Sequence, residues 1–195
     1  MTVRELLDTI RDDYRRHGSH WNERAVWALA VYRFGNWANA RPTRFGRRFF
    51  SKCYGLLDTG SQIVTGVTMN RDVRLGKDFH IVHTGALFIH PQVVIGDRVG
   101  IMQNVTLGTN MGPDVPVIGD DVFIGAGACI LGKVRVGNGA RVAANSLVIN
   151  DVPEGAFAVG VPAKNMKARP RAPREASEAG EMPAAETVSN VSAGD

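Results

Sequence analysis

The sequence predicts a β-helix built from six-residue repeats and preceded by α-helices. An aliphatic side chain returns every sixth residue from 89 to 148 with one interruption, and most are followed four residues later by a small or branched one. A period of six fits neither an α-helix nor an alternating strand and is typical of hexapeptide coils, with both sets pointing inward. The first set is Ile89, Ile95, Ile101, Leu107, Ile118, Ile124, Ile130, Val136, Val142 and Val148, and the second is Val99, Val105, Val122, Ala128, Val134, Ala140, Ser146 and Val152.

The composition favours a single cytoplasmic domain with appendages. Of 195 residues 44% are hydrophobic, and no apolar run is long enough to span a bilayer. Residues 1–13 are charged throughout, so we expect no secretory signal. The two cysteines, Cys53 and Cys129, fall in different segments, which argues against a disulfide framework. The net charge of +4 is too mild to indicate nucleic-acid binding.

The region 1–60 is predicted to be helical, in three helices. We expect a helix over 3–17, another over about 20–39 with Ser19 as its cap, and a third over about 42–57 beginning at Pro42. The second helix carries all three tryptophans and should pack in the core or at a subunit interface. The third mixes Arg and Lys with Phe and Tyr, so residues 41–57 predict either contact with an anionic membrane surface or a solvated face above a buried aromatic stripe.

Residues 61–168 are predicted to form the repeat domain, and residues 169–195, which lack aromatic side chains and periodicity, to be disordered. Two interruptions break the register. Two extra residues fall near His83, between Ile81 and Ile89, and five extra residues within 109–116 must bulge as a loop. Insertions in repeats often mark the binding face, so both positions are predicted to be functional.

Three of the five histidines gather around the first interruption. His80, His83 and His90 are candidates for a general base, because an imidazole titrates near neutral pH. The HxxH spacing of His80 and His83 suits a metal best on a helix, whereas this segment is extended, so we expect no metal site. His17 and His20 are expected to have no special role.

The stretches "IVHTGALFI", "VIGDRVGIMQNVTLG", "VPVIGDDVFIGAGACILGKVRVGNGARVAANSLV" and "AVGVPAKNM" resemble the serine acetyltransferase branch of the hexapeptide acyltransferases. The resemblance covers roughly residues 20–168. It implies a left-handed β-helix, acetyl-CoA as co-substrate, and a homotrimer, possibly a dimer of trimers, with active sites between neighbouring coils.

The resemblance also assigns site residues. His83 matches the catalytic histidine, and backbone N–H groups near Gly108 and Thr109 would stabilise the oxyanion. Lys164 would meet a phosphate of CoA. The groove for the pantetheine arm and nucleotide would lie around Ala126, Gly127, Arg141 and Ala144, although the coil needs the small residues in any case.

Several positions depart from the family pattern. Thr68 and Val82 replace family aspartates, while Asp114 and Val115 replace an Arg-His pair in a shorter loop. A zwitterionic acceptor needs charged partners, because unpaired buried charges are costly. The sequence ends in Ala-Gly-Asp and not in isoleucine, so we expect no docking to a sulfhydrylase.

We therefore predict an acetyl-CoA-dependent O-acetyltransferase that acts on a hydroxyl of a sugar or glycan precursor, with L-serine as the alternative acceptor. A metal-dependent hydratase on the same β-helix and a non-catalytic trimeric scaffold are the remaining alternatives. What orients His83 in place of the family aspartate is left open among Asp72, Asp78 and a neighbouring chain.

Overall fold

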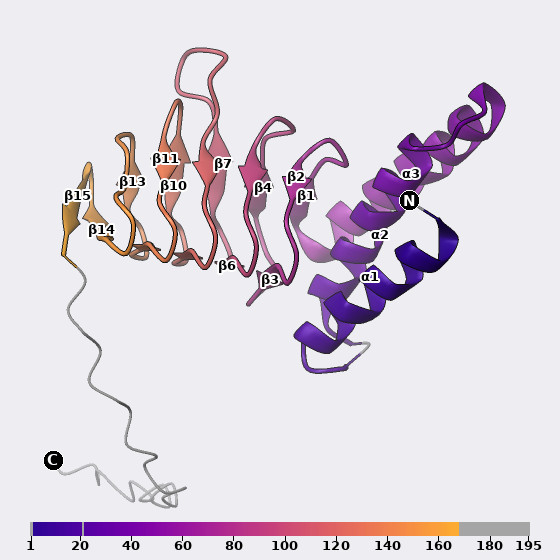
Figure 1. Cartoon of the computed structure of the whole chain (residues 1–195), viewed down its shortest axis with the longest axis horizontal. Helices are drawn as coiled ribbons and strands as arrows, with labels where there is room; N and C mark the ends of the chain where they lie inside the picture. Colours follow the sequence, from indigo (N-terminus) through magenta and orange to yellow (C-terminus); the bar gives the residue numbers. More distant parts are fainter. Residues whose placement is uncertain (1, 21, 168–195) are drawn as a thin grey trace, which may run out of the picture.

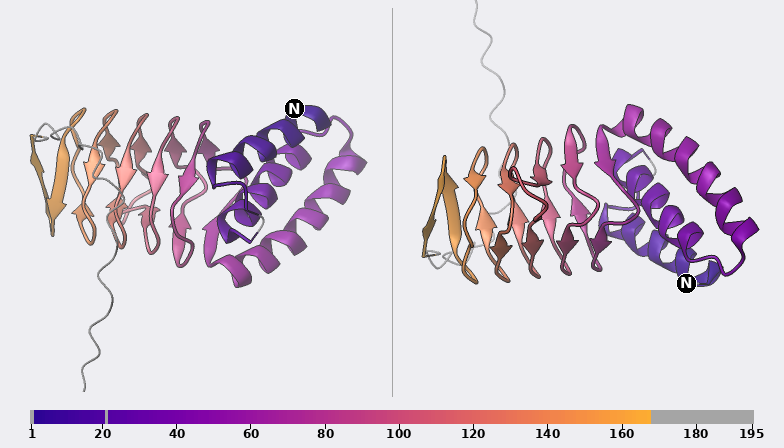
Figure 2. Two further views of the ribbon diagram at one scale, coloured as in Figure 1. Left: turned by 90° about the horizontal axis from the view of Figure 1, so that it is seen from below. Right: turned by 90° about the horizontal axis from the view of Figure 1, so that it is seen from above.

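The computed structural model describes residues 2–20 and 22–167 as three α-helices followed by a β-helix (Figure 1). The predicted disordered tail lies outside the described residues. Helices α1 (Val3–Arg16), α2 (Arg24–Asn39) and α3 (Arg44–Thr65) form a bundle in which α2 lies between the other two (Figure 2).

The strands form three faces, and each of the first four turns of the coil contributes one strand to each face. Face A contains β1 (Val67–Met69), β4 (Leu87–Ile89), β7 (Thr106–Gly108), β10 (Cys129–Leu131) and β13 (Leu147–Val148). Face B contains β2 (Arg74–Leu75), β5 (Val94–Ile95), β8 (Val117–Ile118) and β11 (Arg135–Val136). Face C contains β3 (His80–Ile81), β6 (Gly100–Ile101), β9 (Phe123–Ile124), β12 (Arg141–Val142), β14 (Phe157–Gly160) and β15 (Ala163–Met166).

The predicted register is confirmed in the core. Every residue of both six-residue sets is buried, and equivalent positions pair in register between coils, as Ile89 does with Leu107 and Leu107 with Ile130. Parallel strands so short are stabilised mainly by this stacking of aliphatic side chains on the next coil. The last coil is closed by an antiparallel pair, β14 with β15.

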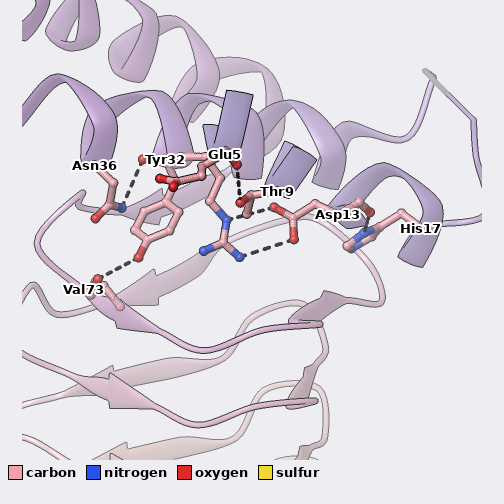
Figure 3. A network of polar contacts seen from close by, with 8 residues as sticks. Glu5, Thr9, Asp13, His17, Tyr32, Asn36 and Val73 are labelled. Atoms are coloured by element: carbon pink, nitrogen blue, oxygen red, sulfur yellow. Dashed lines mark hydrogen bonds and ion pairs between the residues drawn. The ribbon is translucent and has the colours of Figure 1, made fainter. Parts of the chain in front are cut away.

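Helix α2 covers the open first coil. Ala25, Ala28, Leu29 and Tyr32 belong to the same apolar core as the β-helix. The Tyr32 hydroxyl donates to the carbonyl of Val73 at 2.8 Å (Figure 3). The end of a solenoid would otherwise expose its core to water, so this helix serves as the cap that the stack requires.

Two predicted helix starts and one predicted helix end were wrong. Ser19 does not cap α2, since it lies in the preceding turn with φ 60°, and the helix begins after Glu23. Helix α3 is capped by the hydroxyl of Thr43, which accepts from the Gly46 N–H, and Pro42 precedes that cap. The helix continues to Thr65 and stops at Gly66, whose φ of 68° is a left-handed conformation that glycine adopts readily. The first strand therefore begins at Val67, beyond residue 61.

Candidate functional site

His83 lies on an edge where the turns from face C to face A stack on one another. We call this the C–A edge, formed by residues 82–86, 102–105, 125–128 and 143–146. Backbone hydrogen bonds join successive turns: Asn104 N–H donates to Gly85 O at 3.0 Å, Gly127 N–H to Gln103 O at 3.0 Å, and Asn145 N–H to Ala126 O at 2.8 Å. Residues far apart in the sequence thus form one continuous ridge.

The His83 side chain is exposed at the start of this ridge. It makes no hydrogen bond or ion pair with the described residues, so its ring nitrogens are accessible. Asp72 lies in the turn between β1 and β2, and Asp78 in the turn between β2 and β3. These turns are at the other two edges, and neither carboxylate contacts the His83 ring.

The other two histidines of the predicted cluster have separate environments. His90 follows β4 at the far end of face A, where its Nδ1 accepts from the Gln92 N–H at 3.3 Å. His80 is half-buried, and its ring lies 4.9 Å from that of His17 in an edge-on arrangement. Burial lowers the pKa of His80 below 6.5, and the nearby His17, Arg16 and His83 lower it further. Within residues 2–20 and 22–167, no three His, Cys, Asp or Glu side chains form a group that could hold a metal ion.

His17 has a role that the sequence did not reveal. It is buried at the end of α1, where its Nε2 accepts from the Ile81 N–H at 3.1 Å while Nδ1 contacts the carbonyl of Asp13 at 2.7 Å. The Ile81 donor fixes the tautomer, with the ring proton on Nδ1. The same Asp13 forms a buried ion pair with Arg33 at 2.9 Å (Figure 3). Helix α1 is therefore fastened to the strand that leads to His83.

Gln103 is a second residue of the site that was not predicted individually from the sequence. It occupies the turn of the C–A edge next to that of His83, and its side-chain Oε1 is buried without a hydrogen-bond partner among the described residues. Buried polar atoms in native proteins nearly always have partners, and exceptions concentrate where a ligand or water binds. The "IMQN" stretch contained this residue, but its burial depends on the stacking of turns.

Three of the residues assigned to CoA binding lie on the same edge, and two lie on face C. Ala126, Gly127 and Ala144 lie in its later turns, Arg141 begins the neighbouring β12, and Lys164 is on β15 at the end of face C. Arg141 and Lys164 are exposed cations that suit phosphate groups. Gly127 is also required by the fold, because its φ is 71° and a Cβ there would lie 2.2 Å from Oδ1 of Asn145.

Gly108 and Thr109 lie apart from His83 in the single chain. They end β7 and open the loop 109–116, which projects from the coil as predicted (Figure 1). Gly108 is thus at the end of face A opposite the C–A edge. Asp114 and Val115 belong to the same loop, on the edge between faces A and B. One chain therefore presents the proposed base and the proposed oxyanion donors on different edges.

The chain is similar to known proteins in both sequence and fold. Residues 116–150 match the family model described as bacterial transferase hexapeptide (six repeats). The chain superposes on a serine acetyltransferase from Brucella abortus in complex with coenzyme A with a TM-score of 0.71, at 27% identity over 85% of this chain and 69% of that one. The soybean apoenzyme gives a TM-score of 0.71 at 30% identity, over 84% and 69% of the two chains. The coil is the left-handed parallel β-helix that the sequence resemblance implied.

Sequence relatives carry the same name. The serine acetyltransferase of Bacillus pumilus is 34% identical over 131 residues, which are 66% of this chain and 60% of the relative. The match therefore spans less than two thirds of that relative's length. That of Helicobacter pylori strain J99 is 33% identical over 144 residues, covering 72% of this chain and 80% of the relative. With this coverage and the shared fold, the chain belongs to the serine acetyltransferase family of hexapeptide-repeat transferases.

Proposed function

We propose that this protein is an acetyl-CoA-dependent O-acetyltransferase with L-serine as its first candidate acceptor. The observation that carries the proposal is the exposed, unpaired imidazole of His83 at the start of the C–A edge. The later turns of this edge carry small side chains. The named relatives support L-serine better than the sugar or glycan hydroxyl that the sequence analysis favoured. A related structure described as a complex with coenzyme A supports acetyl-CoA as the donor.

In the proposed reaction, His83 accepts the proton of the acceptor hydroxyl as that oxygen attacks the thioester carbonyl. Backbone N–H groups at Gly108 and Thr109 donate to the oxyanion that develops on the carbonyl oxygen. When the carbon–sulfur bond breaks, the His83 imidazolium returns its proton to the departing thiolate. Base catalysis of this kind contributes about 10²–10⁴-fold in rate.

The separation of the two half-sites supports an assembly of several copies. His83 is on the C–A edge and Gly108 on the edge between faces A and B, so a neighbouring copy would complete each site. We propose a homotrimer for this reason, and sedimentation velocity would distinguish a monomer, a trimer and a dimer of trimers. A monomer with full activity would contradict the shared site.

The test is thiol release from acetyl-CoA by wild type and by His83→Ala. We expect release with L-serine to fall by at least about 10²-fold in His83→Ala, because the base is lost. His90→Ala is the matched control and should retain turnover. Undiminished release by His83→Ala would exclude His83 as the base, and failure of the wild type both to turn over and to bind CoA would favour the scaffold alternative.

A sugar hydroxyl remains a second candidate acceptor on one specific observation. Thr68 pairs with Phe88 on face A and Val82 follows β3, so the positions of both family aspartates carry no charge. A neutral acceptor needs no such partners, whereas the ammonium and carboxylate of serine do. The same thiol-release assay with sugars and with L-serine distinguishes the two candidate acceptors. Each hypothesis predicts His83-dependent thiol release with its own acceptor only.

A further inference from the structure

Helix α3 presents a row of large apolar side chains to solvent. Phe45 is 83% exposed, Leu56 77% and Ile63 80%, and Phe49 is also exposed. These residues follow one another at spacings of four, seven and seven, so they lie on one face of the helix. The opposite face packs on α2, where Tyr54 is buried against Gly35. Helix α3 lies on the outer side of the bundle (Figure 2), and the four apolar side chains of the row are exposed to solvent.

An apolar groove lies beside this row. A cavity of about 320 Å³ opens between α2 and α3. Its walls include Trp27, Leu56, Leu57 and Val64. Trp27, Leu57 and Val64 are themselves more than 45% exposed. Together with the row, they make a contiguous apolar surface that a monomeric soluble chain would ordinarily bury.

The charges beside the first half of the row all have one sign. Arg44, Arg48 and Lys52 are exposed on the first half of α3, and the helix has no acidic residue before Asp58. Arg44, Arg48 and Lys52 are spaced by four and so run alongside Phe45 and Phe49. An apolar stripe flanked by cations is the pattern of a helix that lies in the plane of an anionic lipid surface. A second copy would instead bring the same three cations, with only Asp58 to oppose them on this helix.

We propose that the outward face of α3, residues 44–64, docks this protein on an anionic membrane surface. The apolar row enters the headgroup region while the flanking cations meet lipid phosphates and carboxylates. No helix of the described residues is long and apolar enough to cross a membrane, so the contact is along the surface. The proposal is independent of which hydroxyl accepts the acetyl group.

The test is co-sedimentation of the full chain with vesicles of phosphatidylcholine containing about 30% phosphatidylserine. We expect binding at low salt, little binding to pure phosphatidylcholine, and loss of most binding in high salt, where the surface potential is screened. A wild-type chain that does not bind the anionic vesicles at low salt overturns the proposal.

Variants separate the charged from the apolar contribution. Arg44→Gln/Arg48→Gln should weaken partitioning about 30-fold, at about 1 kcal/mol for each cation. Phe45→Ser/Leu56→Ser should weaken it by at least about tenfold, because exposed side chains lose their burial in lipid. Arg4→Gln/Arg11→Gln on α1 is the matched control and should bind as wild type does.

The apolar double variant also tests the alternative occupant. Light scattering should give it the same molecular mass as wild type. If Phe45→Ser/Leu56→Ser instead lowers the mass while wild-type binding to vesicles is absent, the face is an interface between copies and the membrane proposal is wrong. Unchanged vesicle binding by this variant would overturn it as well.

Discussion

Gln103 holds a side-chain oxygen that is buried yet accepts no hydrogen bond from the described residues. Leaving a polar atom in this state costs about 1–3 kcal/mol. A ligand that binds on the C–A edge and donates a hydrogen bond to that oxygen would remove this penalty. Gln103, in the turn next to that of His83, therefore makes separate predictions for stability and for turnover.

We expect Gln103→Leu to keep or raise the free energy of unfolding, because it removes the unsatisfied oxygen at similar volume. We also expect it to lower acetyl transfer about tenfold or more, in line with the loss of one hydrogen bond to a bound ligand. Urea denaturation and thiol release measure the two effects. Turnover equal to wild type would show that no reacting group uses this oxygen.

His17 is the second single residue whose environment makes a definite prediction. His17→Phe keeps an aromatic ring at this position, but the buried Ile81 N–H loses the imidazole nitrogen that accepts its hydrogen bond. The free energy of unfolding should fall by about 1–3 kcal/mol. His20→Phe, at an exposed position nearby, should change it by less than about 0.5 kcal/mol. Equal values for the two variants in urea denaturation would rule out the proposed anchoring of β3.

At the scale of the element, each coil depends on one inward aliphatic residue per short strand. Ile124 of β9 is fully buried between the equivalent residues of β6 and β12, Ile101 and Val142. Because coils contact only their neighbours, a cavity in the middle of the stack weakens two interfaces at once. Strands of two residues form few hydrogen bonds, so the stacking of inward aliphatic side chains is their main stabilising contact.

Ile124→Ala should therefore lower the free energy of unfolding by about 2–5 kcal/mol. Ile149→Ala is the matched control, since Ile149 follows a strand but is 40% exposed, and its effect should stay near or below about 1 kcal/mol. Thermal and urea unfolding at equal protein concentration would measure both, which matters if copies assemble. A small effect at Ile124 would contradict the stacking account.

At the scale of the whole molecule, the junction of the helices with the first coil should make stability depend on pH. His80 lies at this junction, and burial with the neighbouring His17, Arg16 and His83 lowers its pKa below the unfolded value of 6.5. Its neutral form is favoured by folding. This contribution to stability is complete above about pH 6.5 and declines as the pH falls below that value.

We expect the melting temperature to drop between pH 7 and pH 5, and His80→Gln to show a smaller drop, since Gln does not titrate. Thermal scans in buffers of matched ionic strength measure this. His20→Gln, at an exposed position, is the control and should follow wild type. An identical pH dependence in His80→Gln and wild type would show that His80 does not report on the junction.

The sequence alone determined the β-helix, the inward position of each repeat and the loop at 109–116. Each follows from local periodicity, because a residue's place in the six-residue register decides whether it faces the core. The sequence did not determine the end of α3 at Thr65. The segment that begins at residue 61 is rich in Gly, Val and Thr, as the coil is, yet residues 61–65 are still helical.

Only the tertiary structure decided which distant residues meet. It separated His90 from His83, set the ring of His80 against that of His17, joined His17 to β3, and buried the oxygen of Gln103. It also put Gly108 and His83 on different edges of one chain. These arrangements depend on how coils and helices stack across the molecule, and the spacing of residues along the chain does not encode that stacking directly.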